Sequence, residues 1–239
     1  MARPSNKTAL GQILPGFWIG RMAAVRAIFE LQQYDRDNDN HQQDEEWTII
    51  SVLSSRSIIS AITDTLKEEQ RKFGRHLVTH HEVWDLPDKA QSDFVSDRLE
   101  EILSIISNSI ETPVAPITPN NRIKRPRRNV LIHCARGVSR SAAVCSAWLI
   151  SRGGYTLEES LNLIRSARQV NPNLGFLAGL RAIEKCNGNV QKARERLTQS
   201  RNKPSGKDLP KEKVKEGNNE TNDKVIQNTV VDGNWEVSC

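Results

Sequence analysis

The sequence VLIHCARGVSRSAA at residues 130–143 passes from an apolar run, through a short turn that contains a cysteine, into a second apolar run. Residues 130–132 are typical of a central strand that is buried on both faces. Residues 141–151 are apolar on nearly all sides, which predicts a buried helix. Cys134 therefore lies where a buried strand leads into a buried helix, and Gly137 permits the tight turn between them.

This strand–turn–helix arrangement favours binding of a tetrahedral dianion. The turn directs backbone N–H groups into one concavity, and the helix N-terminus adds a partial positive charge. The same field stabilises a thiolate at Cys134, and the thiolate is the nucleophilic form of cysteine. Arg140 offers a planar guanidinium that matches two phosphoryl oxygens. We predict that the phosphate-binding loop consists of Ala135, Arg136, Gly137, Val138, Ser139 and Arg140.

Strand-forming and helix-forming segments alternate along the rest of the chain. Strand patterns occupy residues 17–20, 47–53, 76–84 and 130–133. Helix patterns occupy residues 22–34, 57–73, 94–107 and 141–151, and three more segments that follow Thr156, Asn171 and Val190. Thr156 and Glu159 form a capping-box pattern. The alternation predicts an α/β fold in which helices flank a central, mainly parallel sheet.

The length of 239 residues suits one domain of ordinary size. We expect a flexible N-terminus at residues 1–9 and a catalytic domain at residues 10–198. Residues 199–239 form a predicted disordered tail, because this polar segment cannot bury enough apolar surface to offset its ordering entropy. Two polar segments, near residues 35–46 and 112–129, are predicted to be surface loops inserted into the domain.

The composition narrows the partners and the cellular setting. The longest apolar run, residues 142–150, is too short to span a bilayer, so we expect no membrane insertion. Four irregularly spaced cysteines do not indicate a disulfide framework, which favours a cytoplasmic protein. The basic run at residues 122–128 has three open interpretations: a nuclear import signal, a docking patch for acidic substrates, or a solvated loop.

Other functional classes lack their sequence signals. The basic residues are not interleaved with aromatic residues, so nucleic-acid binding is not expected. The histidines show no spacing typical of a metal site, and we predict none.

The segment His133-Cys134-x-x-Gly137-x-Ser139-Arg140-Ser141 resembles the active-site signature of cysteine-dependent protein phosphatases, in particular the dual-specificity branch. The resemblance extends over about residues 12–185 and includes the segments at 13–20, 155–161 and 168–176. It implies a protein tyrosine phosphatase-like fold. It also implies hydrolysis of phosphotyrosine and phosphoserine/threonine in phosphorylated protein substrates, through a phosphocysteine and without a cofactor. Two alternatives stay open: a phosphoinositide or other non-protein phosphatase, and a catalytically inactive phosphate-binding module.

The resemblance also implies individual roles. Cys134 is the expected nucleophile, and Ser141 assists departure of its thiolate in the second step. His133 orients the loop and helps to lower the thiol pKa, whereas Asn173 matches a supporting position near the loop.

The mechanism further needs a carboxylic acid to protonate the leaving oxygen. We predict Asp85, because it directly follows a strand and lies at nearly the family's distance from Phe94. Asp88, on the same segment, is the alternative.

Overall fold

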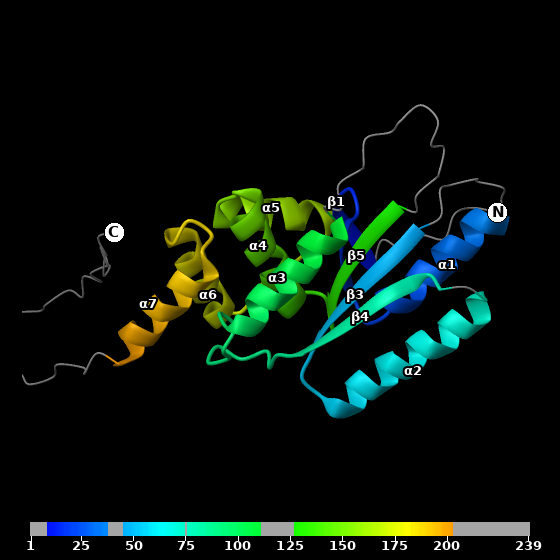
Figure 1. The fold of residues 1–239 in the computed structure, drawn as a ribbon, viewed down its shortest axis with the longest axis horizontal. Helices are drawn as coiled ribbons and strands as arrows, with labels where there is room; N and C mark the ends of the chain where they lie inside the picture. The colour runs from blue at the N-terminus through cyan, green and yellow to red at the C-terminus, as the bar shows by residue number, and fades with distance from the viewer. Residues whose placement is uncertain (1–8, 38–44, 75, 111–126, 203–239) are drawn as a thin grey trace, which may run out of the picture.

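The computed structural model describes residues 9–37, 45–74, 76–110 and 127–202. Most of the predicted N-terminal segment, most of both inserted loops, the basic run up to residue 126 and the tail beyond residue 202 lie outside these ranges. The described part contains a five-stranded sheet in the order β1-β2-β5-β3-β4 (Figure 1). The strands are β1 (Leu10–Leu14), β2 (Phe17–Arg21), β3 (Glu45–Leu53), β4 (Val78–Asp85) and β5 (Arg127–Cys134).

The sheet is mainly parallel, as the sequence predicts. The β2–β5, β5–β3 and β3–β4 pairs are parallel, and only the β1–β2 hairpin at the edge is antiparallel. The sequence analysis did not predict β1 as a separate strand. It is a five-residue edge strand that joins β2 through a tight turn at Gly16, whose φ of 78° is in the left-handed region.

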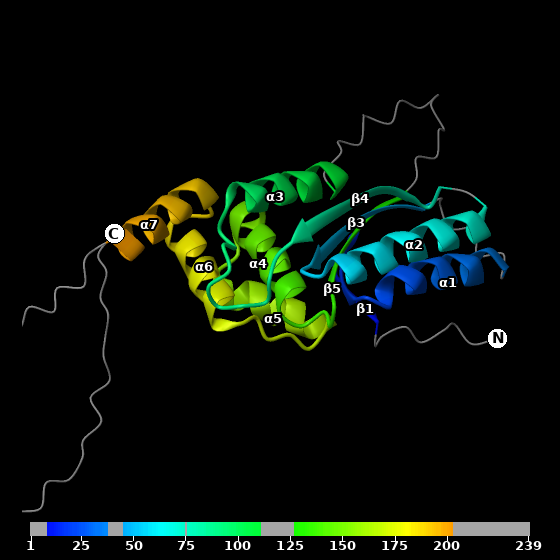
Figure 2. The same cartoon turned by 90° about the horizontal axis from the view of Figure 1, so that it is seen from below.

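Helices of the described part cover both faces of the sheet. Figures 1 and 2 show α1 and α2 against one face and α3, α4 and α5 against the other, whereas α6 packs on α4 and α7 packs on α6. The two hydrophobic cores divide in the same way, since neighbouring residues of β3 and β5 contribute to opposite cores. The helices are α1 (Ala24–Asp37), α2 (Arg56–Phe73), α3 (Asp97–Ile110), α4 (Arg140–Gly153), α5 (Leu157–Ala167), α6 (Leu174–Lys185) and α7 (Val190–Asn202).

Helix α4 is the centre of the larger core. Every residue from 140 to 150 is buried, which agrees with its apolar sequence on all sides. Its N-terminus follows directly from the end of β5, so strand and helix together fix the loop between them. Helix α5 begins with the predicted capping box, in which Glu159 N–H donates to Thr156 Oγ1 at 3.2 Å and Thr156 N–H donates to Glu159 Oε2 at 2.8 Å.

Regular structure extends into the expected loops. Helix α1 continues to residue 37 and β3 begins at residue 45, at the two ends of the first loop, and β5 begins at residue 127, at the C-terminal end of the second. Polar pairing explains the extensions, because Glu45 Oε2 accepts hydrogen bonds from Gln32 Nε2 at 2.8 Å and Asn129 Nδ2 at 3.1 Å. At the other end, α7 continues to residue 202, beyond the predicted boundary at 198.

Candidate active site

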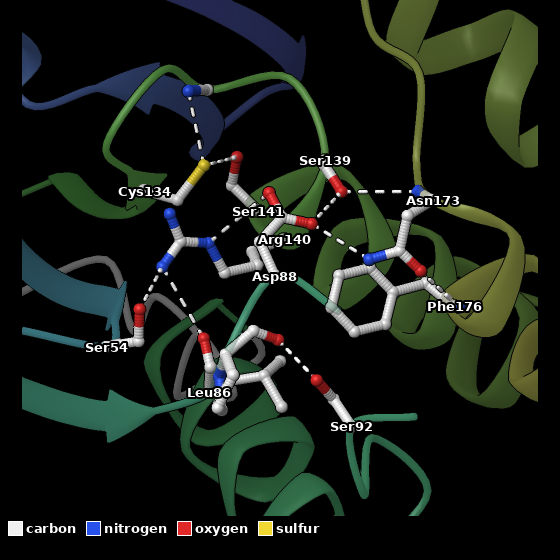
Figure 3. Close-up of polar contacts among 12 residues, drawn as sticks. Ser54, Leu86, Asp88, Ser92, Cys134, Ser139, Arg140, Ser141, Asn173 and Phe176 are labelled. Carbon is white, nitrogen blue, oxygen red and sulfur yellow. Dashed lines mark hydrogen bonds and ion pairs between the residues drawn. The ribbon is translucent and has the colours of Figure 1, made fainter. Parts of the chain in front are cut away.

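The phosphate-binding loop predicted from the sequence, residues 135–140, follows Cys134, which is the last residue of β5. The side chain of Cys134 is buried, with 2% of the residue exposed. Its sulfur accepts a hydrogen bond from Gly137 N–H at 3.2 Å and lies 3.3 Å from Ser141 Oγ (Figure 3). The loop therefore closes over the sulfur at the point where α4 begins.

Gly137 makes this closure possible. Its φ of 69° is in the left-handed region, and a Cβ atom there would lie 2.5 Å from the carbonyl oxygen of Gly20. Any larger residue would strain the turn and push the loop away from β2.

The surroundings of Cys134 favour the thiolate. Burial raises the pKa of the thiol, but hydrogen bonds from Ser141 and Gly137 and the positive charge of Arg140 outweigh it. The pKa is therefore lowered from the ordinary value of a cysteine. Cys145 lies inside the buried helix α4, where burial raises the pKa of its thiol, so this thiol stays protonated.

Arg140 is the first residue of α4 and is itself buried. Its Nη1 donates to Ser54 Oγ at 3.3 Å and to the carbonyl oxygen of Leu86 at 3.4 Å, which orients the guanidinium beside the sulfur (Figure 3). Its Nε is buried without a hydrogen-bond partner among the described residues, and the nearest carboxylate oxygen, Asp88 Oδ2, lies 3.7 Å away. A buried donor in this position is suited to an anionic ligand oxygen.

The structure brings Asp88, rather than the predicted Asp85, to the loop. Asp88 Oδ1 accepts hydrogen bonds from Ser139 Oγ at 2.7 Å and from Asn173 Nδ2 at 2.8 Å. Asp85 is exposed at the end of β4 and makes no hydrogen bond or ion pair to another side chain in the described ranges. Asp88 is therefore the carboxylate that contacts the loop, and the choice between Asp85 and Asp88 as proton donor stays a prediction.

The chain turns toward the loop only after Asp85. Leu86 N–H donates to the carbonyl oxygen of Leu53, so the chain remains extended for one residue past β4. Helix α3 begins at Asp97 instead of the expected Phe94, although Phe94 is buried as a helical core residue would be.

Asn173 lies at the loop, as the resemblance implies. Its side chain caps α6 by accepting from Phe176 N–H at 3.0 Å, and its own N–H donates to Ser139 Oγ at 3.2 Å. Asn173 thus links α6, the loop and Asp88. His133 is fully buried beneath the loop, with Nε2 2.7 Å from Ser51 Oγ.

Arg168 has no role in the sequence analysis, yet it contacts the outer side of the loop. Its Nε donates to the carbonyl oxygen of Gly137 at 2.9 Å and its Nη2 to that of Arg136 at 3.0 Å. A third hydrogen bond, from Asn171 N–H, reaches the carbonyl oxygen of Val138 at 2.9 Å. Arg136 itself is exposed.

Comparison with known proteins decides the family. Residues 59–186, more than half of the chain, match the family model described as dual specificity phosphatase, catalytic domain. The chain belongs to this family. The match includes the phosphate-binding loop and Asp88 of this dual specificity phosphatase domain, whereas β1, β2 and β3 precede it.

Individual relatives match over shorter segments. Mouse dual specificity phosphatase 28 is 47% identical over 55 residues, which are 23% of this chain and 34% of the mouse protein. The putative tyrosine phosphatase 123R of Invertebrate iridescent virus 6 is 29% identical over 104 residues, which are 43% of this chain and 63% of the viral protein. The chain thus spans less than two thirds of either relative.

Solved structures agree with the fold. The human tyrosine phosphatase-like serine/threonine/tyrosine-interacting protein superposes with a TM-score of 0.50 at 18% identity, over 75% of this chain and 97% of the other. The crystal structure of DUSP15 also gives a TM-score of 0.50 at 18% identity, over 80% of this chain and 96% of the other. The dual specificity phosphatase domain therefore has the predicted phosphatase-like α/β fold.

The described residues contain neither a membrane-spanning helix nor a metal-binding cluster. None of their helices combines the length and apolar character needed to cross a membrane. No group of three or more His, Cys, Asp or Glu side chains in the described ranges is arranged to hold a metal ion.

Proposed function

We propose that this chain hydrolyses phosphotyrosine and phosphoserine/threonine monoesters in proteins through a phosphocysteine intermediate. The observation that carries the proposal is the convergence of Cys134, Arg140 and Asp88 at the buried N-terminus of α4. A nucleophile with a lowered pKa, a buried guanidinium donor and a carboxyl group on the facing segment are the three parts that this reaction needs.

In the first step, the Cys134 thiolate attacks phosphorus opposite the leaving oxygen. A bond forms between sulfur and phosphorus while the bond from phosphorus to the ester oxygen breaks. Arg140 and the loop N–H groups hold the equatorial oxygens, which gain negative charge in the transition state. Asp88, held by Ser139 and Asn173, gives its proton to the departing oxygen.

In the second step, a water molecule attacks the phosphocysteine. Asp88, now ionised, accepts a proton from that water as the new bond to phosphorus forms. The sulfur leaves as a thiolate, and Ser141 Oγ, 3.3 Å away, is placed to donate a hydrogen bond to it. Inorganic phosphate is released, and both Cys134 and Asp88 return to their starting protonation states.

The substrate class is supported by membership of the dual specificity phosphatase family. An inositol-phosphate substrate would favour additional basic residues in the loop, and Arg136 is the one such residue besides Arg140. Phosphorylated proteins are therefore the proposed partners. A cytoplasmic location, with access to the nucleus, stays a prediction.

The test compares Cys134→Ser with Cys186→Ser, a matched control at the C-terminal end of α6. Rapid quenching of the wild-type chain with a radiolabelled phosphopeptide should trap phosphate on Cys134. Cys134→Ser should give neither labelled protein nor free phosphate, and Cys186→Ser should retain both. Turnover by Cys134→Ser would overturn the nucleophile assignment, and preferred turnover of phosphoinositide vesicles over phosphopeptides would overturn the substrate class.

A further inference from the structure

Three polar side chains from neighbouring strands form a hydrogen-bonded chain below the phosphate-binding loop. Ser51 Oγ on β3 lies 2.8 Å from Nε2 of His81 on β4 and 2.7 Å from Nε2 of His133 on β5. Figure 1 shows these three strands side by side. The chain thus leads from the edge strand of the sheet to the residue that precedes the nucleophile.

This polar chain lies in an apolar part of the sheet. Ser51 and His133 are fully buried, and His81 is half-buried. Ser51 and His133 are register partners in β3 and β5, next to the buried apolar residues Ile50 and Ile132. Burial of polar groups is unfavourable unless they are hydrogen-bonded, so the geometry of each member depends on the other two.

The two hydrogen bonds that join His81, Ser51 and His133 must point in the same direction. Burial, aided by the nearby His81, lowers the pKa of His133 to about 3, so its imidazole is neutral at physiological pH. Burial also lowers the pKa of His81. Because Ser51 has one hydroxyl proton, it can donate to only one of the two neutral rings, and the other ring must donate to Ser51.

One of the two directions runs inward from His81. In this direction His81 Nε2–H donates to Ser51, the Ser51 hydroxyl donates to His133 Nε2, and the proton of His133 is on Nδ1. His133 Nδ1 is buried without a hydrogen-bond partner among the described residues, so Ser51 Oγ is the side-chain partner that orients the ring. Either direction gives His133 a single tautomer.

We propose that Ser51 and His81 are positioning residues that hold the ring of His133, the residue before Cys134, in one orientation and one tautomer. The inference rests on the proposed function, in which Cys134 is the nucleophile. Ser51 and His81 touch neither substrate nor the reacting sulfur. Their effect on Cys134 passes through the ring of His133.

The first measurement is the tautomer itself. Long-range ¹H–¹⁵N spectra of the wild-type chain, labelled at histidine, distinguish a protonated Nδ1 from a protonated Nε2. The expected result for His133 is a single tautomer in the wild-type chain, with a mixture of tautomers in His81→Leu and Ser51→Ala. A mixture in the wild-type chain, or an unchanged single tautomer in both variants, would overturn the proposal.

The second measurement is the rate of Cys134 alkylation by iodoacetamide as a function of pH. His81→Leu and Ser51→Ala should slow alkylation near pH 6 by about five- to tenfold, the factor expected for one lost hydrogen bond. His81→Gln should stay close to wild type, because its amide N–H replaces the ring donor. His80→Leu, at the exposed neighbour of His81 that pairs with Glu82 at 3.5 Å, is the control and should have no effect.

These measurements are independent of turnover, so they separate this inference from the proposed function. Equal alkylation rates in His81→Leu, His80→Leu and wild type would refute the positioning role even if the chain is an active phosphatase. His81 is half-buried, so the test remains available through its variants if Ser51→Ala fails to fold.

Discussion

Replacement of Asp88 by asparagine provides the sharpest test of the site, because it removes an acid and leaves its two hydrogen bonds in place. The Asn oxygen can still accept hydrogen bonds from Ser139 Oγ and Asn173 Nδ2, which lie 2.7 and 2.8 Å from Asp88 Oδ1. Each such bond contributes about 1 kcal/mol to stability. Since both survive, we expect the free energy of unfolding to change by less than about 1 kcal/mol.

The rate should change far more than the stability. General acid catalysis contributes about 10²- to 10⁴-fold, so kcat for a phosphotyrosine peptide should fall by that factor in Asp88→Asn, a barrier increase of about 3–5 kcal/mol. An activated aryl phosphate needs less help in leaving, so its kcat should fall less.

The matched control is Asp85→Asn, three residues earlier and exposed. It should keep kcat within about twofold of wild type, as a surface substitution does. Steady-state kinetics on the two substrates, with thermal unfolding to verify folding, complete the experiment. A large loss in Asp85→Asn with full activity in Asp88→Asn would refute the reasoning from contacts and return the acid to Asp85.

Three further outcomes are expected. The lowered pKa of Cys134 means that the thiolate stabilises the fold. The free energy of unfolding, measured in urea, should therefore be higher in wild type than in Cys134→Ala by an amount that depends on pH. This difference should be fully present above about pH 8.5 and should be lost as the pH falls through the pKa of the folded thiol. Gly137→Ala should lose most phosphatase activity and about 1–3 kcal/mol, because its Cβ meets the Gly20 carbonyl. Gly74→Ala, which shares a positive φ but faces open space, should keep its activity in the same assay. Thr156→Ala should lower the thermal midpoint through a loss of about 1 kcal/mol, from the α5 capping box, with kcat unchanged.

The parts of the structure that sequence could predict are those fixed by local chemistry. The apolar run into Cys134, the glycine turn and the buried helix after it depend on neighbours in the chain, and they occur where the sequence places them. The same holds for Thr156 and Glu159, whose capping box requires only four consecutive residues.

The other parts depend on contacts between distant segments. Asp88 was ranked below Asp85 because its partners, Ser139 and Asn173, are 51 and 85 residues away in the chain. Arg168 and Ser51 gave no signal, because a side chain that supports a loop or a buried ring from another element has no fixed spacing to it. The start of β3 within the first expected loop gave no signal for a similar reason, since Glu45 pairs with Gln32 and Asn129 of other elements.

The complete burial of α4 from residue 140 to residue 150 affects how substrate binding depends on ionic strength. At physiological salt, mobile ions screen exposed charges from one another beyond about 8 Å, but they do not enter a packed interior. The attraction of the α4 N-terminus for a bound dianion is therefore largely shielded from added salt, whereas the exposed side chain of Arg136 is not. Added salt should therefore lower the association rate of an anionic substrate more than it speeds the dissociation of a phosphoryl group that is already bound in the loop.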